Sequence, residues 1–102
     1  MLEAIDRILR YIHGMTFDTF ANDRRTQDAV AMNFEILGEA ANHVPPEIRA
    51  RYGQVPWSKI RGLSNIVAHS YFALNISIVW QTSKDDLPGL PPLLHEILEK
   101  EP

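Results

Sequence analysis

Apolar residues recur at helical spacing along the whole chain, and this pattern limits the fold more than any other feature. At the start of the sequence, Leu2, Ile5, Ile8, Leu9 and Ile12 follow the i, i+3, i+4, i+7 spacing of one helix face. No segment shows sustained alternation of apolar and polar residues between hairpin turns, the pattern of a half-buried strand. We therefore predict an all-α fold, an up-down helical bundle with additional short helices.

Glycines and prolines divide the chain into its predicted helices. Gly14 follows the last periodic residue of the first helix and ends it, and the turn-rich stretch 15–23 is expected to be a loop. Asp23 is a predicted N-cap for a long helix over 24–43. The remaining helices are predicted from Pro46 through Tyr52, from near Trp57 to about Phe72, after an Asn75 cap until Pro88-Gly89, and after Pro91-Pro92.

The predicted helix over 24–43 carries two apolar stripes. One consists of Val30, Phe34, Leu37, Ala41 and Val44, and the other of Ala29, Met32, Ile36 and Ala40. A helix that is apolar on two sides must be covered on two sides. In so short a chain, a second subunit could supply the second cover.

Length and composition exclude several classes of protein. The chain has 102 residues, which predicts a single domain over 1–102. It has no cysteine, which excludes a disulfide scaffold, a Cys-based zinc site and a thiol nucleophile. No apolar run approaches the roughly 20 residues that span a bilayer, and the charged, amphipathic start is unlike a secretory signal. We expect a cytoplasmic protein without a membrane partner.

Charge is unevenly distributed along the sequence. Residues 48–84 hold five cations and no acid, so they carry +5, while the rest carries −8 and the whole chain −3. Chance explains this uneven charge distribution as well as a functional role would. The functional interpretation is a local anion-binding face on an acidic body.

The segment 57–72, WSKIRGLSNIVAHSYF, combines an apolar face with a polar stripe. At about 100° per residue, Arg61, Asn65 and His69 fall within one stripe, opposite the apolar arc of the helix. A guanidinium can hold a phosphate, an imidazole can move a proton near neutral pH, and an amide can orient either. RNA supplies its own 2′-hydroxyl nucleophile, so these groups are sufficient for metal-free cleavage of RNA. By spacing alone, a solvated helix face is the commoner explanation.

Other residues give no further site. His13, His43 and His95 lie on three segments without metal-ligand spacing, so we predict neither a metal nor a cofactor. The aromatic residues Phe34, Trp57, Phe72 and Trp80 are expected in the core or an interface, not as platforms for stacked bases.

Three stretches resemble the HepT-like family of the HEPN superfamily: DRRTQDAVAMNFEILGEAANHVPPEIRARYGQVPW at 23–57, IRGLSNIVAHSYFALNISIVW at 60–80 and DLPGL at 86–90. The resemblance covers nearly the whole chain. It implies a HEPN-type bundle, a homodimer and a ribonuclease toxin whose antitoxin is a small MntA-type nucleotidyltransferase. In the family, an arginine precedes a histidine by four to six residues, and x-Tyr follows. These side chains of two subunits line one cleft, and the antitoxin can adenylylate the tyrosine.

The family's motif can be aligned with this sequence residue by residue, and the sequence departs from it at one position. His69 matches the motif histidine and would be the general acid/base, Tyr71 matches the tyrosine that is adenylylated, and Asn65 matches the polar residue after the arginine. Ser64 occupies the position of the arginine itself, and Arg61 is the nearest arginine. We predict His69 and Arg61 as catalytic residues, with Asn65 and Ser64 supporting the site.

This departure leaves two functions open. Arg61 precedes His69 by eight residues, about 12 Å of helical rise, and leans toward the helix N-terminus, away from His69. Arg61 of one subunit would therefore have to face His69 of the other. One possibility is a metal-independent endoribonuclease, weakened or altered by Ser64. The alternative is an inactive module that binds a nucleotidyltransferase or a nucleotide. We favour the first because His69 and Tyr71 are retained.

Overall fold

The computed structural model describes residues 1–69 and 76–101, without the side chains at 64 and 66–69. In chain order its elements are α1 (Leu2–Ile12), α2 (Phe17–Ala21), α3 (Arg24–Asn42), α4 (Pro46–Arg51), α5 (Trp57–His69), α6 (Ile76–Asp85), the short 3-10 helix η2 (Leu87–Gly89) and α7 (Leu90–Lys100). The described ranges contain no strand, so the predicted all-α class is confirmed. None of the helices described is both long and apolar enough to cross a membrane.

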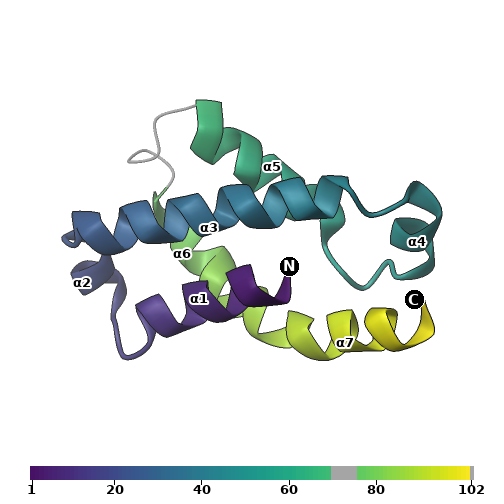
Figure 1. The fold of residues 1–102 in the computed structure, drawn as a ribbon. Helices are drawn as coiled ribbons and strands as arrows, with labels where there is room; N and C mark the ends of the chain where they lie inside the picture. The colour runs from purple at the N-terminus through teal and green to yellow at the C-terminus, as the bar shows by residue number, and fades with distance from the viewer. Residues whose placement is uncertain (70–75, 102) are drawn as a thin grey trace.

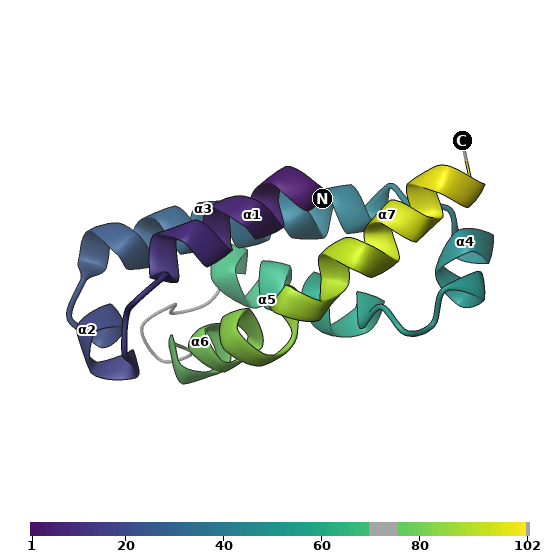
Figure 2. The same cartoon turned by 90° about the horizontal axis from the view of Figure 1, so that it is seen from below.

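The long helix α3 is the central element of the bundle (Figure 1). α1 runs antiparallel to it on one side, and α5 packs along it on another. α6 and α7 both contact α1, and the view from below shows α2 beside the beginning of α3, at the end of the bundle opposite the C-terminus (Figure 2). α1 and α3 therefore form the antiparallel pair of the predicted up-down bundle, and the shorter helices complete it.

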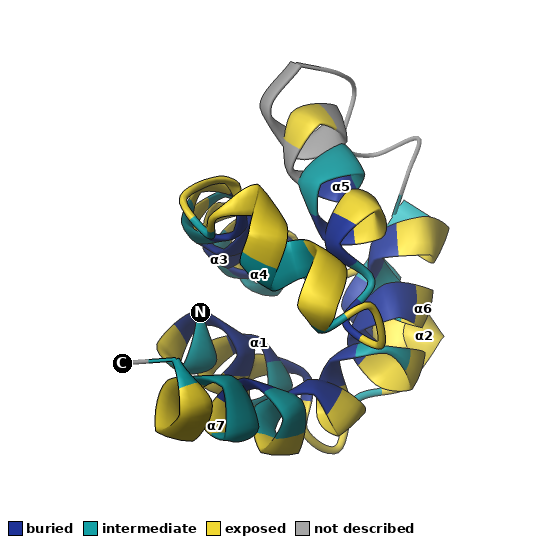
Figure 3. Cartoon of the chain, turned by 90° about the vertical axis from the view of Figure 1, so that its right-hand side faces the viewer, coloured by how far each residue is buried: buried dark blue, intermediate teal, exposed yellow. Residues whose placement is uncertain are grey.

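The core lies where these helices meet. Ile5 and Ile8 of α1, Phe34 of α3 and Ile60 of α5 are each at most 1% exposed. The burial of apolar area at this junction drives the packing. In Figure 3 the buried residues lie where the helices face one another and the exposed residues lie on the outside, and α4 has no buried residue.

The two predicted stripes of α3 differ in burial. Val30, Phe34, Leu37 and Ala41 of the first stripe are completely buried. Of the second stripe, Met32 is 57% exposed and Ile36 is 43% exposed. One chain therefore covers only the first stripe, and the second remains an apolar surface of α3.

Most predicted helix ends are confirmed. Asp23 caps α3, because its carboxylate accepts the backbone N–H of Thr26 at 3.1 Å. Gly14 ends α1 with φ +78°, a conformation that glycine adopts without steric cost. α5 is described as far as His69, whereas the prediction extended to Phe72. Phe72 and the predicted cap Asn75 lie outside the described residues.

The prediction of a loop over 15–23 is wrong, because α2 occupies its middle. Thr16 caps α2 through a reciprocal pair of bonds with Thr19, the capping-box arrangement. Phe20 is completely buried. Gln27 of α3 donates its side-chain Nε2 to the carbonyl oxygens of Phe20 and Ala21, both at 2.9 Å. Contacts from outside the segment thus stabilise a helix too short to form alone.

Candidate functional site

The site predicted from the sequence lies on α5, and the packing of α5 determines which of its positions face outward. Ile60 and Leu63 are buried against α3. Trp57, at the first position of the helix, is also buried, and its indole N–H donates to the Tyr52 carbonyl oxygen at 3.1 Å. With this face turned inward, Arg61 is half-buried and Asn65 is exposed.

Arg61 makes a specific contact with α3. Its Nε donates to the side-chain Oδ1 of Asn42 at 2.6 Å. Asn42 is the last residue of α3, where unpaired carbonyl groups give the helix end a partial negative charge that favours a nearby cation. A guanidinium has five N–H donors, so four remain for a phosphate. Arg61 is thus oriented by a neighbouring helix and is not simply a solvated side chain.

The remaining predicted site residues are placed only in part. Positions 61, 65 and 69 follow one another at intervals of four residues in the continuous helix α5, and His69 is its last residue. Such spacing keeps the three positions on one side of the helix. The side chains of Ser64 and His69 are not described, and Tyr71 lies outside the described residues. Within one chain, the backbone at positions 61 and 69 remains about 12 Å apart along the axis.

The basic stretch 48–84 does not form a uniform anion-binding face. Arg51 pairs with Glu101, and Lys59 Nζ lies 2.6 Å from Asp86 Oδ2. Both acids come from beyond residue 84, so folding compensates charges that the sequence separates. Arg61 has no carboxylate within ion-pair distance among the residues described.

Gly62 gives α5 no close contact in this chain. A Cβ built on it would meet nothing within 4 Å. The glycine is therefore tolerated at an open surface position, at a cost of about 1 kcal/mol in helix propensity relative to alanine.

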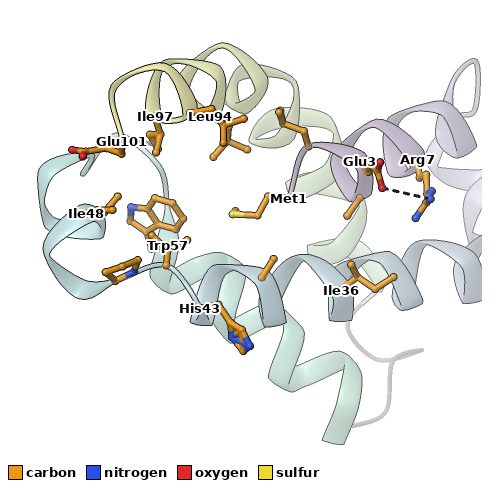
Figure 4. A pocket seen from close by; sticks show the side chains of 16 residues that line it. Met1, Glu3, Arg7, Ile36, His43, Ile48, Trp57, Leu94, Ile97 and Glu101 are labelled. Carbon is orange, nitrogen blue, oxygen red and sulfur yellow. Dashed lines mark ion pairs between the residues drawn. The ribbon is translucent and has the colours of Figure 1, made fainter.

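An apolar hollow opens at one end of the bundle, between α1, the end of α3, α4 and α7 (Figure 4). Its volume is about 580 Å³. Ile36, Trp57, Leu94 and Ile97 contribute apolar surface, and the Glu3–Arg7 ion pair lies at its rim. Ile36 belongs to the uncovered stripe of α3, so the hollow and that stripe form one apolar region.

Metal ligands do not gather in the described part of the chain. Across residues 1–69 and 76–101, no three side chains of the types His, Cys, Asp or Glu are grouped so that they could hold a metal ion. The polar stripe of α5 consists of a guanidinium at position 61 and an amide at position 65, with an imidazole at position 69, the residue that ends the helix.

A comparison with known protein families identifies the family to which the chain belongs. The family described as "Ribonuclease HepT-like" matches residues 1–97. The chain belongs to the HepT-like family. The HepT-like match includes all five predicted site positions and every helix, apart from the last residues of α7.

Several relatives carry ribonuclease names. A protein of Caldanaerobacter subterraneus named "Putative RNase" is 33% identical over 99% of this chain and 90% of its own length. A protein of Methanocaldococcus jannaschii with the same designation is 33% identical, over 97% of this chain and 82% of its own length. The "Probable ribonuclease HepT" of Thermococcus cleftensis is 32% identical over 86% of this chain and 80% of its own length. No solved structure shows a significant match.

Sequence reasoning missed Asn42 as a neighbour of the predicted site. The residue ends the run GEAAN at 38–42, which lies within the stretch 23–57 that resembles the family. That run was a usable signal, but only the packing of α3 on α5 shows which of its side chains meets Arg61.

Proposed function

We propose that this protein is a metal-independent endoribonuclease that acts as the toxin of a toxin–antitoxin pair. Membership of the HepT-like family over residues 1–97 is the observation that carries the proposal. The ribonuclease names of relatives that align over most of this chain support the reaction class. The protein would act in the cytoplasm as a single domain over 1–102.

The groups on α5 suit an internal transesterification of RNA. A 2′-hydroxyl oxygen attacks the adjacent phosphorus, and a general base removes its proton. The bond from phosphorus to the 5′-oxygen breaks, and that oxygen leaves with a proton from a general acid. His69 is our candidate for proton transfer, and Arg61 for stabilising the charge on the phosphoryl oxygens. Asn65 and Ser64 would orient the linkage.

We propose a homodimer because one chain separates the two principal groups. The positions of Arg61 and His69 differ by about 12 Å of helical rise, and Arg61 is directed to Asn42 on α3. A second copy related by a two-fold axis could place its His69 against this Arg61. The uncovered stripe of α3, with Met32 and Ile36 exposed, offers apolar surface for such a contact.

Cleavage of a labelled RNA by purified protein in excess EDTA tests the activity. We expect the wild type to cut, and His69→Ala and Arg61→Ala each to reduce the rate by roughly 10²–10³. Arg24→Ala is the matched control, since Arg24 is an exposed arginine that pairs with Asp28 and begins α3, at the opposite end of that helix from Asn42. Cleavage that depends on an added metal, or that survives His69→Ala, would contradict the proposal.

A second candidate is an inactive module that binds the nucleotidyltransferase or a nucleotide through the same surface. Ser64 at the expected arginine position favours it. Ser64→Arg separates the two functions. Activity in this variant that the wild type lacks would establish the inactive member, whereas a wild type that cuts and depends on Arg61 would establish the shifted arginine.

The proposed partner is an MntA-type nucleotidyltransferase, and Tyr71 is the proposed site of adenylylation. A reading frame for such an enzyme beside this one would support the pairing. Incubation with that enzyme and ATP should add adenylyl groups to the wild type and abolish RNA cleavage. Tyr71→Phe should remain unmodified and active. Adenylylation of Tyr71→Phe to the same extent as the wild type would exclude Tyr71 as the modified residue.

A further inference from the structure

An aromatic surface lies where α2 meets α6, away from the apolar hollow at the other end of the bundle (Figure 2). Trp80 of α6 is its centre and is half-buried. The completely buried Phe20 lies behind it, with ring centroids 5.1 Å apart. Phe17 stands edge-on to the indole, at 6.3 Å and an interplanar angle of 62°. Phe17 is 37% exposed, so the aromatic group continues to the surface.

Polar side chains surround this surface. Ser77, Gln81, Lys84 and Asp85 line a shallow hollow of about 370 Å³ together with Phe17 and Trp80. Lys84 Nζ lies over the Trp80 ring, 5.5 Å from its centroid. Among the described residues, no carboxylate forms an ion pair with Lys84. A cation without an acidic partner therefore sits beside a half-exposed indole.

We propose that this surface binds one base and a neighbouring phosphate of single-stranded RNA. The inference rests on the proposed function, since it assigns a binding subsite for the RNA substrate. Proteins that bind single strands combine aromatic faces, on which bases stack, with cations that follow the backbone. Trp80 supplies the face, and the buried Phe20 packs behind its ring. Lys84 has a flexible stem, and it can leave the ring for a phosphate when a base takes its place.

The polar rim indicates which base fits. Adenine presents an N6 amino donor and an N7 acceptor on one edge, which a glutamine amide can pair in bidentate fashion. Gln81 lines the hollow, and Asp85 adds a carboxylate that accepts from an exocyclic amino group. Uracil can also pair with a glutamine amide, through its N3–H and O4, but it has no exocyclic amino group to donate to the Asp85 carboxylate. We therefore infer that the subsite prefers adenine to uracil.

The expectation that Trp80 is a core or interface aromatic agrees with its inner side, which packs against the core. Packing accounts for its contact with the buried Phe20. It does not account for the outward side, where Phe17, Gln81 and Lys84 are all exposed. α6 begins seven residues after His69, so the backbone of its first residue, Ile76, lies at most about 25 Å from that of His69.

Binding of a ten-residue oligoadenylate with 2′-O-methyl sugars tests the subsite. This probe has no free 2′-hydroxyl and cannot be cleaved by the proposed chemistry. In a Trp57→Phe background, Trp80 is the sole tryptophan, and we expect the probe to quench its fluorescence. In fluorescence anisotropy with the otherwise wild-type chain, Trp80→Leu should weaken binding by on the order of tenfold. The anisotropy measurement does not need the Trp57→Phe background, so it tests the subsite even if that variant fails to fold.

Lys84→Gln tests the phosphate contact separately. Removing one phosphate contact to a single strand should reduce the slope of log K against log salt by about 0.7. Lys100→Gln is the matched control, because it removes the same charge from an exposed lysine on α7, and its slope should equal that of the wild type. Oligouridylate should bind more weakly than oligoadenylate, and a strand of the same length without bases more weakly still.

The outcomes separate this proposal from the proposed function. Equal binding of the base-free strand, or unchanged affinity in a folded Trp80→Leu variant, would overturn the subsite even if the protein cleaves RNA. Trp80-dependent binding by a protein that never cleaves RNA would sustain the subsite and refute the ribonuclease.

Discussion

Arg61 of α5 and Asn42 of α3 are joined by a hydrogen bond of 2.6 Å from Nε to Oδ1. The contact links the polar stripe of α5 to the C-terminal end of α3, and it holds the guanidinium beside a helix end that favours positive charge. An arginine fixed in this way retains four N–H donors for a phosphate. The relationship makes Asn42 a positioning residue for the proposed chemistry.

Asn42→Ala should slow RNA cleavage by about tenfold, because Arg61 keeps its charge but loses one hydrogen bond that orients it. The effect should be smaller than that of Arg61→Ala. In an Arg61→Ala background, Asn42→Ala should have no additional effect on the cleavage rate, since residues that act through one contact are not additive. Equal, additive losses in the two backgrounds would show that Asn42 acts independently of Arg61.

Met32→Glu and Ile36→Glu should each shift the protein from dimer to monomer. Both side chains lie on the uncovered stripe of α3, and a carboxylate buried in an apolar interface without a partner is strongly unfavourable. Sedimentation at micromolar concentration measures the change. Gln54→Glu is the control, since Gln54 is exposed in the connection before α5. A wild type that sediments only as a monomer would contradict the dimer.

Local sequence patterns predicted the long elements because each of these carries its own signals. α1 has an apolar stripe and Gly14 behind it, and α3 has its Asp23 cap and a stripe that is completely buried. α2 escaped prediction because it is held by distant groups: Gln27 satisfies its last carbonyls, and Phe20 packs on Trp80, which is 60 positions away. Periodicity within a segment contains no information about such partners.

The candidate site, too, was predictable from local sequence patterns only in part. The stripe through positions 61 and 65 follows from helical spacing, and the structure places Arg61 and Asn65 on the outward side of α5. The contact with Asn42 depends on how α3 crosses α5, which neither helix encodes alone. Likewise, the apparent basic stretch loses much of its charge to Asp86 and Glu101, acids that only the fold brings near.

Gln27→Leu should destabilise the fold by about 1–3 kcal/mol. The side chain is 6% exposed and donates to two carbonyl oxygens at the end of α2. With leucine, the Ala21 carbonyl would lose this donor, and the Phe20 carbonyl would keep the backbone N–H of Asp23 at 3.2 Å. Urea unfolding at one fixed protein concentration measures the loss. The neighbouring Asp28→Asn removes only an exposed pair with Arg24 and should change stability by less than about 0.5 kcal/mol. Equal stabilities of the two variants would refute the assigned role of Gln27.

Asp23 should make the stability of α3 sensitive to acid. Its pKa lies below the ordinary value of 3.8 because the Thr26 hydroxyl and backbone N–H donate to the carboxylate, at 2.7 and 3.1 Å. A carboxylate whose pKa is lowered by folding stabilises the native state above its unfolded pKa, and this contribution is lost as the pH falls through the folded value.

The stabilisation from the Asp23 charge is therefore expected to be complete above pH 3.8 and to disappear progressively below it. Asn also caps helices but does not titrate. In urea unfolding at successive pH values, any advantage of the wild type over Asp23→Asn should shrink below this point. Thr26→Val, which removes the hydroxyl donor, should raise the folded-state pKa of Asp23 toward 3.8, so that the acid-dependent loss becomes smaller and is complete at a higher pH. A wild type and an Asp23→Asn variant that lose stability in parallel throughout the acid range would show that the cap acts without its charge.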